Sequence, residues 1–158
     1  MAAVDGTVSA LRANSGQRLW QLNAGGSIYC PLLLMDTGAL VMATQAGRIV
    51  ALEPASGQQL ADASLGEQPT GLARLSSTLF AVTTAPGTVA ALRLDAATTR
   101  VCLADRVLLQ GEVFARPVAA TWSAGGSDGE QARWPGLLVG CRDDHLCCLM
   151  LWPELVAL

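Results

Sequence analysis

The chain has 158 residues, of which 51% are hydrophobic and 15% are charged. This composition is too apolar for a disordered protein, and the length is enough for one domain with its own core. The net charge is −3 and there is no basic run, which excludes the charge pattern of a nucleic-acid-binding protein.

The N-terminal segment, MAAVDGTVSA, lacks the basic start and the apolar core of a secretory signal, and no apolar run approaches the length of a membrane span. The five cysteines are an odd number, and none belongs to a CxxC pair. We therefore expect reduced, mostly buried thiols in a cytoplasmic protein with no membrane or nucleic-acid partner. The cysteines are Cys30, Cys102, Cys141, Cys147 and Cys148.

Three segments repeat one pattern: a glycine, a short alternating run that ends in or near Ala-Leu, a polar turn and a second short run. They are DGTVSALRANSGQRLWQL (5–22), AGRIVALEPASGQQLADA (46–63) and PGTVAALRLDAATTRVCL (86–103). Their glycines, Gly6, Gly47 and Gly87, are about 40 positions apart, which is the period of a repeat protein built from small sheets.

A fourth copy is RDDHLCCLML (142–151), in which Asp143-Asp144 takes the place of Asp5-Gly6. It follows the third copy by more than one period. The surplus matches the polar stretch SAGGSDGEQARW (123–134), which we interpret as a loop insertion.

Within one full unit the pattern predicts β-strands, because short Val/Leu/Ile runs alternate with turns that end in glycine. The two central runs, such as ALVMAT and RIVALE, are apolar almost throughout, which is typical of strands buried on both faces. Four antiparallel strands in about 40 residues make one propeller blade. For the second unit the expected strands are 27–34, 39–46, 48–53 and 58–64.

The segment DGTVSALRANSGQRLW closely resembles the repeat of PQQ-type β-propellers, and the resemblance covers nearly the whole chain. It implies an all-β, incomplete quinoprotein-like propeller of about three to four blades, each of four antiparallel strands. The expected division is a half blade (1–24), a blade (25–65), a second blade (66–110) and a last blade (111–158). The last blade would carry the insertion at 123–134 and lack its outer strand. We therefore expect a fragment of a longer propeller, marginally stable or self-associating when isolated.

A narrower resemblance lies in GEVFARPV (111–118) and GLLVGCRDDHLCCLML (136–151), which look like the C-terminal propellers of β-alanine-activating enzymes, adenylate-forming members of the acyl-CoA synthetase family. The resemblance implies that a full-length relative activates an amino or fatty acid with ATP and loads it on a phosphopantetheine carrier. An adenylating catalyst normally uses a lysine, and all ten basic residues here are arginine. This chain is therefore expected to be no enzyme itself.

Several residues have both a functional and a structural interpretation, and the structural one is favoured for each. Trp20 occupies the tryptophan position of the PQQ-type repeat, which in that family packs between adjacent blades. Cys147 and Cys148 could form a vicinal disulfide of the quinoprotein kind, but neighbours on a strand point to opposite faces. His145 beside Asp143 and Asp144 lacks further metal ligands and is interpreted as part of a turn.

The remaining polar candidates are expected in turns and loops. The charged groups Arg142-Asp143-Asp144, Asp105-Arg106 and Asp128-Gly129-Glu130 are interpreted as solvated loop tips. Ser15 and Ser56 stand at equivalent turn positions and lack the context of a catalytic nucleophile. No catalytic, cofactor-binding or metal-binding residue is assigned, and no cofactor is expected.

Three functions remain open from the sequence. The first is a non-catalytic interaction segment of a β-alanine-activating enzyme, with the rest of the propeller or another protein as its partner. The second is a fragment of a PQQ-binding quinoprotein, which would need calcium ligands and more blades. The third is an outer-membrane assembly scaffold, which shares the PQQ-type repeat but works in an oxidising compartment.

Overall fold

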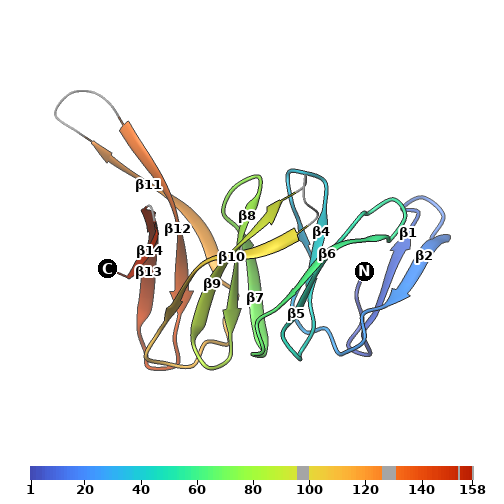
Figure 1. Ribbon diagram of the computed structural model, residues 1–158, viewed down its shortest axis with the longest axis horizontal. Helices are drawn as coiled ribbons and strands as arrows, with labels where there is room; N and C mark the ends of the chain where they lie inside the picture. The colour runs from blue at the N-terminus through green and yellow to red at the C-terminus, as the bar shows by residue number, and fades with distance from the viewer. Residues whose placement is uncertain (96–99, 126–130, 153, 158) are drawn as a thin grey trace.

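The computed structural model describes residues 1–95, 100–125, 131–152 and 154–157, and the regular structure in them is all β-strand (Figure 1). The strands form four antiparallel sheets that follow one another in chain order along the long axis of the molecule (Figure 1). Within this described part of the chain, no helix has the length and apolar character needed to cross a membrane.

The first sheet has two strands and the other three have four strands each. In chain order the strands are β1 (Thr7–Leu11), β2 (Arg18–Asn23), β3 (Leu33–Leu34), β4 (Leu40–Ala43), β5 (Arg48–Leu52), β6 (Gln59–Ser64), β7 (Pro69–Arg74), β8 (Leu79–Thr84), β9 (Thr88–Asp95), β10 (Arg100–Leu108), β11 (Val118–Gly125), β12 (Gln131–Gly140), β13 (Leu146–Trp152) and β14 (Glu154–Ala157).

Each four-stranded sheet is a meander, in which every strand pairs with its neighbours in the sequence. A row of such sheets packed face to face is the architecture of a β-propeller, so the chain is a partial propeller, as its repeat predicts. The two-stranded sheet corresponds to the second half of the next blade. Its strands have the same register, since Ala10 lies opposite Trp20 in β1–β2 and Ala51 lies opposite Ala61 in β5–β6.

The core lies between the sheets because each central strand sends alternate side chains to two neighbours. In the second blade, Met42 and Val50 pack against the first sheet, whereas Val41, Ile49 and Ala51 pack against the third. In the third blade, Phe80 faces the second sheet. Strands β4, β5, β8 and β9 are consequently buried on both faces, as their apolar sequences predict.

The repeat glycines hold consecutive segments at close range. Gly6, Gly47 and Gly87 have φ angles of 86°, 84° and 101°, and a Cβ on any of them would lie 2.5 or 2.6 Å from a backbone carbonyl oxygen. Their own carbonyls accept hydrogen bonds from the residue that follows each outer strand, at 2.9 to 3.0 Å. In the fourth copy Asp144 has φ 65° and is the one described non-glycine residue with positive φ, consistent with its alignment to Gly6.

Trp20 joins the first two sheets. Its Nε1 donates a hydrogen bond to the Pro54 carbonyl oxygen at 2.8 Å, and its ring lies against Gly57, whose Cβ, if present, would come within 2.7 Å of the ring carbons. The interpretation of Trp20 as a packing residue between adjacent blades is confirmed by these contacts.

Strand lengths differ from the expectation at the inner edge of the second blade. The expected strand 27–34 is regular only at Leu33–Leu34. Pro31 has no N–H to give to a ladder, and the Ser27 carbonyl accepts from the backbone N of Gln45 in the next turn instead. The other three expected strands are found, each shorter at one or both ends.

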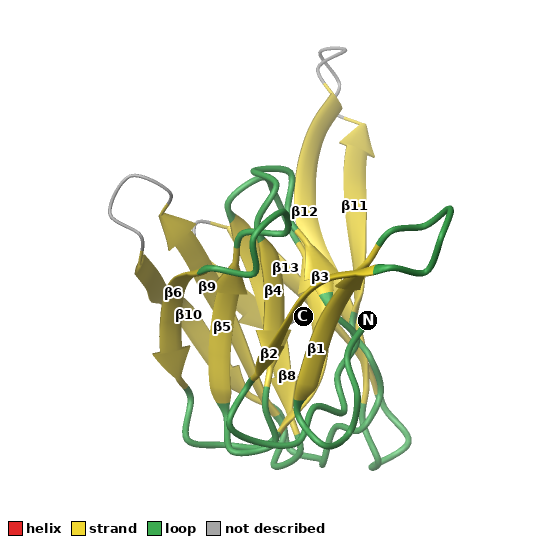
Figure 2. Cartoon of the chain, turned by 90° about the vertical axis from the view of Figure 1, so that its right-hand side faces the viewer, coloured by secondary structure: helices red, strands yellow, loops and turns green. Residues whose placement is uncertain are grey.

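Two expectations for the last blade are wrong. The stretch 123–134 was expected to be a loop, but its two ends extend β11 and β12 in register, with Ser123 opposite Arg133. This hairpin projects beyond the other sheets (Figures 1 and 2). Each of its strands pairs about half of its backbone groups with the other strand and leaves the outward-pointing half to solvent.

The outer strand expected to be missing is present. Strand β14 pairs with β13 from Leu149 opposite Ala157 to Trp152 opposite Glu154. A four-residue strand was too short to be read from the sequence, but it covers backbone groups on the edge of β13 that would otherwise lack partners.

The contact between Trp20 and Gly57 predicts that Gly57→Ala destabilises the fold more than Gly16→Ala. Both glycines occupy the same turn position of the repeat with similar φ angles, 74° and 67°, so both changes carry about 1–2 kcal/mol of left-handed strain. Nothing lies within 4 Å of a Cβ on Gly16, so the clash with the ring adds roughly 1–3 kcal/mol for Gly57 alone. Equilibrium urea unfolding measures both, and equal losses would contradict the packing role of Trp20.

Candidate functional site

The first strands of the three complete blades, β3, β7 and β11, form the inner surface of the partial propeller. A cavity of about 470 Å³ opens between them. Its exposed residues are Leu34, Arg74, Arg116, Val118 and Ala119, and we call the first four the inner-strand surface. Leu34 in β3 and Val118 in β11 are each 58% exposed, so an exposed aliphatic side chain stands on either side of β7.

Local structure brings the two sides of this surface together. Gly71 in β7 has no side chain, and Pro117 and Arg116 occupy the space that its Cβ would fill. The segment before β11 can therefore approach β7 closely. This contact sets the aliphatic side chain of Val118 and the guanidinium of Arg116 on the same cavity wall.

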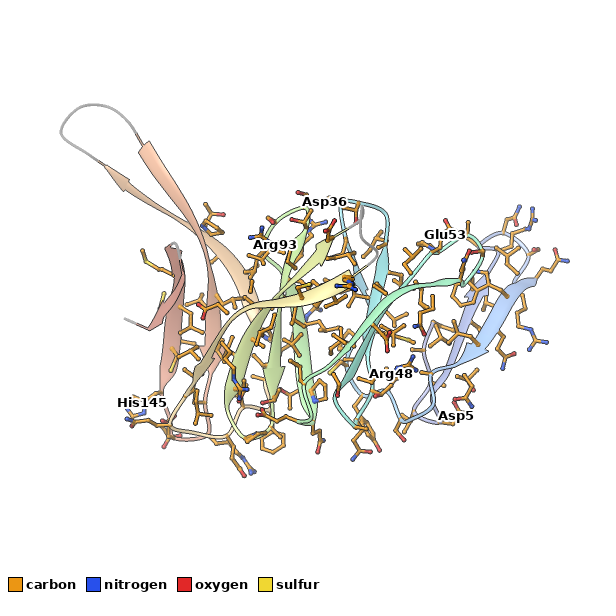
Figure 3. All side chains as sticks on the ribbon, viewed as in Figure 1. Asp5, Asp36, Arg48, Glu53, Arg93 and His145 are labelled. Carbon is orange, nitrogen blue, oxygen red and sulfur yellow. The ribbon has the colours of Figure 1, made fainter. Side chains whose placement is uncertain are left out.

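The charge on the inner-strand surface is positive. Arg74 pairs with Asp36. In Figure 3, Asp36 lies at the edge of the molecule opposite Asp5 and His145. Among the described residues, no carboxylate pairs with Arg116. Two aliphatic side chains beside one unpaired guanidinium suit a partner segment that combines apolar and acidic groups.

A second polar cluster ties the connection between β6 and β7 to strands β8 and β10 and has a structural role. The Glu67 carboxylate accepts hydrogen bonds from Thr84 Oγ1 at 2.7 Å and from Arg106 Nη2 at 3.2 Å. The Thr84 hydroxyl, followed by other hydrogen bonds and by the charge of Arg106, lowers the pKa of Glu67. Asp105 and Arg106 were expected at a loop tip, which is wrong, because both lie in β10 beside a bulge that gives this part of the strand its extra residue.

His145 lies beside a turn, as interpreted from the sequence. Its side chain is exposed, and its Nδ1 lies 2.8 Å from the Asp143 carbonyl oxygen and 3.4 Å from Asp143 Oδ2. Arg142, in the same turn, pairs with Glu112 at 3.2 Å and lies over the Phe114 ring at 4.9 Å. In the described ranges, no three histidine, cysteine or acidic residues are placed to hold a metal ion.

The cysteines are less buried than expected, because only Cys30 of the five is buried. Cys147 and Cys148 lie opposite Val139 and Leu138, on alternate faces of β13, which opposes a vicinal bond. Cys141 and Cys147 meet across the turn, with 3.6 Å between their sulfur atoms, a contact that was not expected from the sequence. Their spacing around Asp143-Asp144, on one face of a hairpin, was the signal that could have shown it.

The remaining sequence candidates have local roles. The Ser56 hydroxyl donates to Glu53 Oε2 at 2.7 Å and accepts from the backbone N of Gln58 at 3.2 Å. Ser15 Oγ accepts from the backbone N of Gln17 at 3.4 Å, so both serines serve their turns. Asp128, Gly129 and Glu130 lie outside the described residues.

A sequence-family model described as outer membrane protein assembly factor BamB matches residues 1–121. No curated protein matches the chain. Among solved structures, BamB from Moraxella catarrhalis is similar, with 21% identity and a TM-score of 0.70 over 96% of this chain and 44% of that one.

Two other solved propellers share the fold at lower identity. A chain of a mitotic checkpoint complex has 14% identity and a TM-score of 0.68, over 91% of this chain and 42% of its own. U3-55K has 15% identity and a TM-score of 0.64, over 98% of this chain and 58% of its own. The chain thus spans only about half of the length of these structures, and at such identities the likeness shows the fold alone.

Burial of Cys30 predicts a stability that falls in alkali. Desolvation raises the pKa of Cys30 from 9.0 to about 11. The contribution of the neutral thiol to the free energy of unfolding is therefore fully present below pH 9. It is lost as the pH rises towards 11, by up to about 1.4 kcal/mol per pH unit. Urea unfolding at pH 8 to 11 should show a steeper loss for the unaltered chain than for Cys30→Ala. Cys102→Ala, at an exposed position, is the control and should keep the steep loss; the same slope in Cys30→Ala would refute the burial effect.

Proposed function

Because the chain belongs to the family of the outer membrane protein assembly factor BamB, whose model covers residues 1–121, we propose that it is a non-catalytic propeller segment that binds another protein. The observation that carries this proposal is the inner-strand surface. Two aliphatic side chains and two arginines stand exposed there on adjoining strands of a rigid scaffold.

The inner-strand surface has the features of a protein-binding site rather than a reaction site. Its polar groups are guanidinium donors, which bind carboxylates but do not act as bases or nucleophiles at neutral pH. Leu34 and Val118 supply the apolar contact that the centre of an interface needs. We therefore expect the partner to present an acidic and apolar segment to this surface.

Two cellular settings are candidates for this scaffold. The narrower resemblance, in GEVFARPV and GLLVGCRDDHLCCLML, favours a cytoplasmic propeller of a β-alanine-activating, adenylate-forming enzyme, in which the catalysis belongs to other domains. The family match fits an outer-membrane assembly scaffold equally well. We place the first setting ahead because five cysteines, an odd number, suit a reducing compartment.

The inner-strand surface can be tested with the double variant Leu34→Asp, Val118→Asp. Both side chains are largely exposed, so the fold should persist with little loss of stability, whereas partner binding should fall by at least about tenfold, as for a central apolar contact. The measurement is quantitative mass spectrometry of the proteins retained by the immobilised chain from extracts of the cells that make it.

Leu108→Asp is the control for this test, because Leu108 is 68% exposed but lies on the outer strand β10. It should retain the same proteins as the unaltered chain. If the double variant also retains them unchanged, the inner-strand surface is not the binding site and the proposal fails.

The oxidation state of Cys141 and Cys147 distinguishes the two cellular settings. Their sulfur atoms lie 3.6 Å apart, so a small movement would allow a disulfide to form by loss of two hydrogens to an oxidising partner. The cytoplasmic setting predicts free thiols in cells lysed in acid and then alkylated, as read by peptide mass spectrometry. A linked Cys141–Cys147 peptide would favour the outer-membrane setting instead, and Cys141→Ser identifies the bond.

A further inference from the structure

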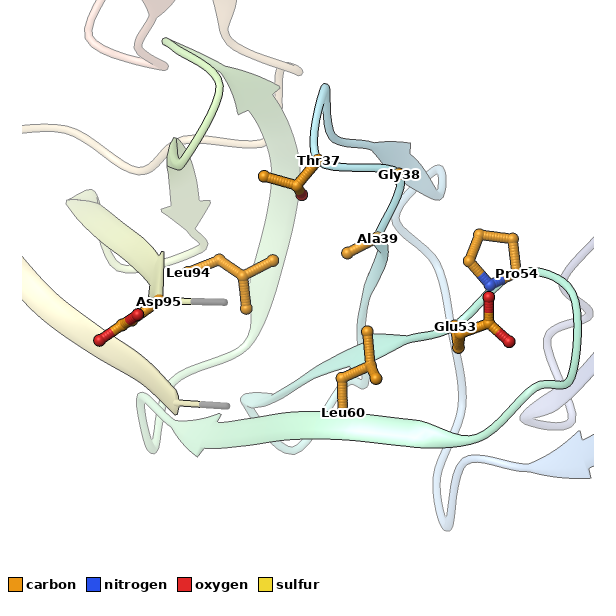
Figure 4. Close-up of a pocket in the computed structure, with 8 residues that line it drawn as sticks. All are labelled: Thr37, Gly38, Ala39, Glu53, Pro54, Leu60, Leu94 and Asp95. Atoms are coloured by element: carbon orange, nitrogen blue, oxygen red, sulfur yellow. The ribbon is translucent and has the colours of Figure 1, made fainter. Parts of the chain in front are cut away.

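A cavity of about 190 Å³ lies between the second and third blades, bounded by β6 on one side and the end of β9 on the other. Its floor is apolar and buried, with Ala39 at 5% and Leu94 at 3% exposure, and Thr37 at its rim is exposed. Figure 4 shows Leu60, Leu94 and Ala39 pointing into the same space from three different segments. The cavity therefore combines an apolar interior with access from the surface.

The register of the repeat places this cavity beside the position that is equivalent to Trp20 one blade earlier. Trp20 lies opposite Ala10 in β1–β2, and Ala61 lies opposite Ala51 at the same position of β5–β6. Trp20 spans the first junction to reach Pro54. By the spacing of Gly47 and Gly87, the equivalent of Pro54 in the next blade is Leu94, which lines the cavity together with Leu60, the neighbour of Ala61.

At the second junction Ala61 and Leu94 thus stand at the positions of Trp20 and Pro54, and no aromatic side chain stands at the first of them. We propose that this cavity takes an aromatic side chain from a partner protein, which completes the second junction as Trp20 completes the first. The proposal rests on the scaffold function proposed above, but it uses a surface separate from the inner-strand surface.

The dimensions and the chemistry of the cavity suit an aromatic ring. Apolar cavities of roughly 150 Å³ bind benzene, so about 190 Å³ has room for a larger ring. Aromatic side chains that enter such preformed pockets commonly dominate the affinity of an interface. The chain itself shows the geometry, since the Trp20 ring packs on Gly57 and donates its N–H to a backbone carbonyl.

The charges at the rim select the residues that flank the ring. The charged residues that line the cavity are Glu53 and Asp95, on opposite sides of it (Figure 4). Ser56 fixes the Glu53 carboxylate through its backbone N and hydroxyl, at 3.1 and 2.7 Å. The Glu53 carboxylate therefore favours a partner segment with arginine or lysine next to the aromatic residue and disfavours one with an acidic neighbour.

The test uses four blocked peptides: Gly-Arg-Trp-Gly, Gly-Arg-Phe-Gly, Gly-Glu-Trp-Gly and Gly-Arg-Ala-Gly. The 158-residue chain, with isotope-labelled leucine methyl groups, is titrated with each and followed by NMR. The two basic aromatic peptides should shift the Leu60 and Leu94 signals saturably. The acidic peptide should bind several-fold more weakly, and the alanine peptide should leave the signals unchanged.

Two variants block the cavity from different sides. Ala61→Trp supplies the missing ring, and Ala39→Leu fills the space from the floor, so either should weaken peptide binding at least about tenfold. Ala104→Trp, at an exposed position on β10, is the matched control and should bind as the unaltered chain does. Having two blocking variants keeps the test decisive if one of them misfolds.

The proposal is overturned if no aromatic peptide binds saturably, or if peptides bind equally well to both blocking variants. Failure here leaves the scaffold function untouched, because that function is measured through Leu34 and Val118. Conversely, loss of partner binding in the Leu34→Asp, Val118→Asp variant, with peptide binding retained, would separate the two surfaces.

Discussion

The structure depends on burial that no sheet can achieve alone. Strands β4, β5, β8 and β9 carry apolar side chains on both faces, so a single blade in water would expose one face or the other. Each face is covered only by the next blade, through clusters that alternate along one strand, such as Val41 on one side and Met42 on the other. Stability is therefore a property of neighbouring pairs, as in other repeat proteins.

The close approach of the turn before each third strand to the connection that follows the outer strand imposes a second constraint, which explains why glycine recurs once in each repeat. At Gly6, Gly47 and Gly87 the carbonyl of the following connection lies where a Cβ would stand, and the positive φ excludes most other residues. These turns fix the spacing of the blades, which in turn sets the depth available for side chains between them. Asp144 shows that the fourth copy keeps the backbone geometry without the glycine.

The sequence was enough to predict the parts of the structure that repeat. Glycine spacing and two-face apolar runs identified the blades, and Trp20 was placed between blades through the resemblance to the PQQ-type repeat. It could not show features that depend on a single contact: the β11–β12 extension, the short β14, and the meeting of Cys141 with Cys147 across a turn. The inner-strand surface was also missed, because Leu34 and Val118 look like core residues until the neighbouring strands are placed.

A repeat with a fixed backbone allows side chains to diverge at equivalent positions without loss of the fold. The change from Trp20 in one blade to Ala61 in the next shows the consequence, since the equivalent position carries a ring at one junction and lies beside a cavity at the other. Because Ala61 remains buried, the blade can still pack there while the space beside it opens to the surface. Function in such a scaffold therefore arises where one copy departs from the pattern that the other copies keep.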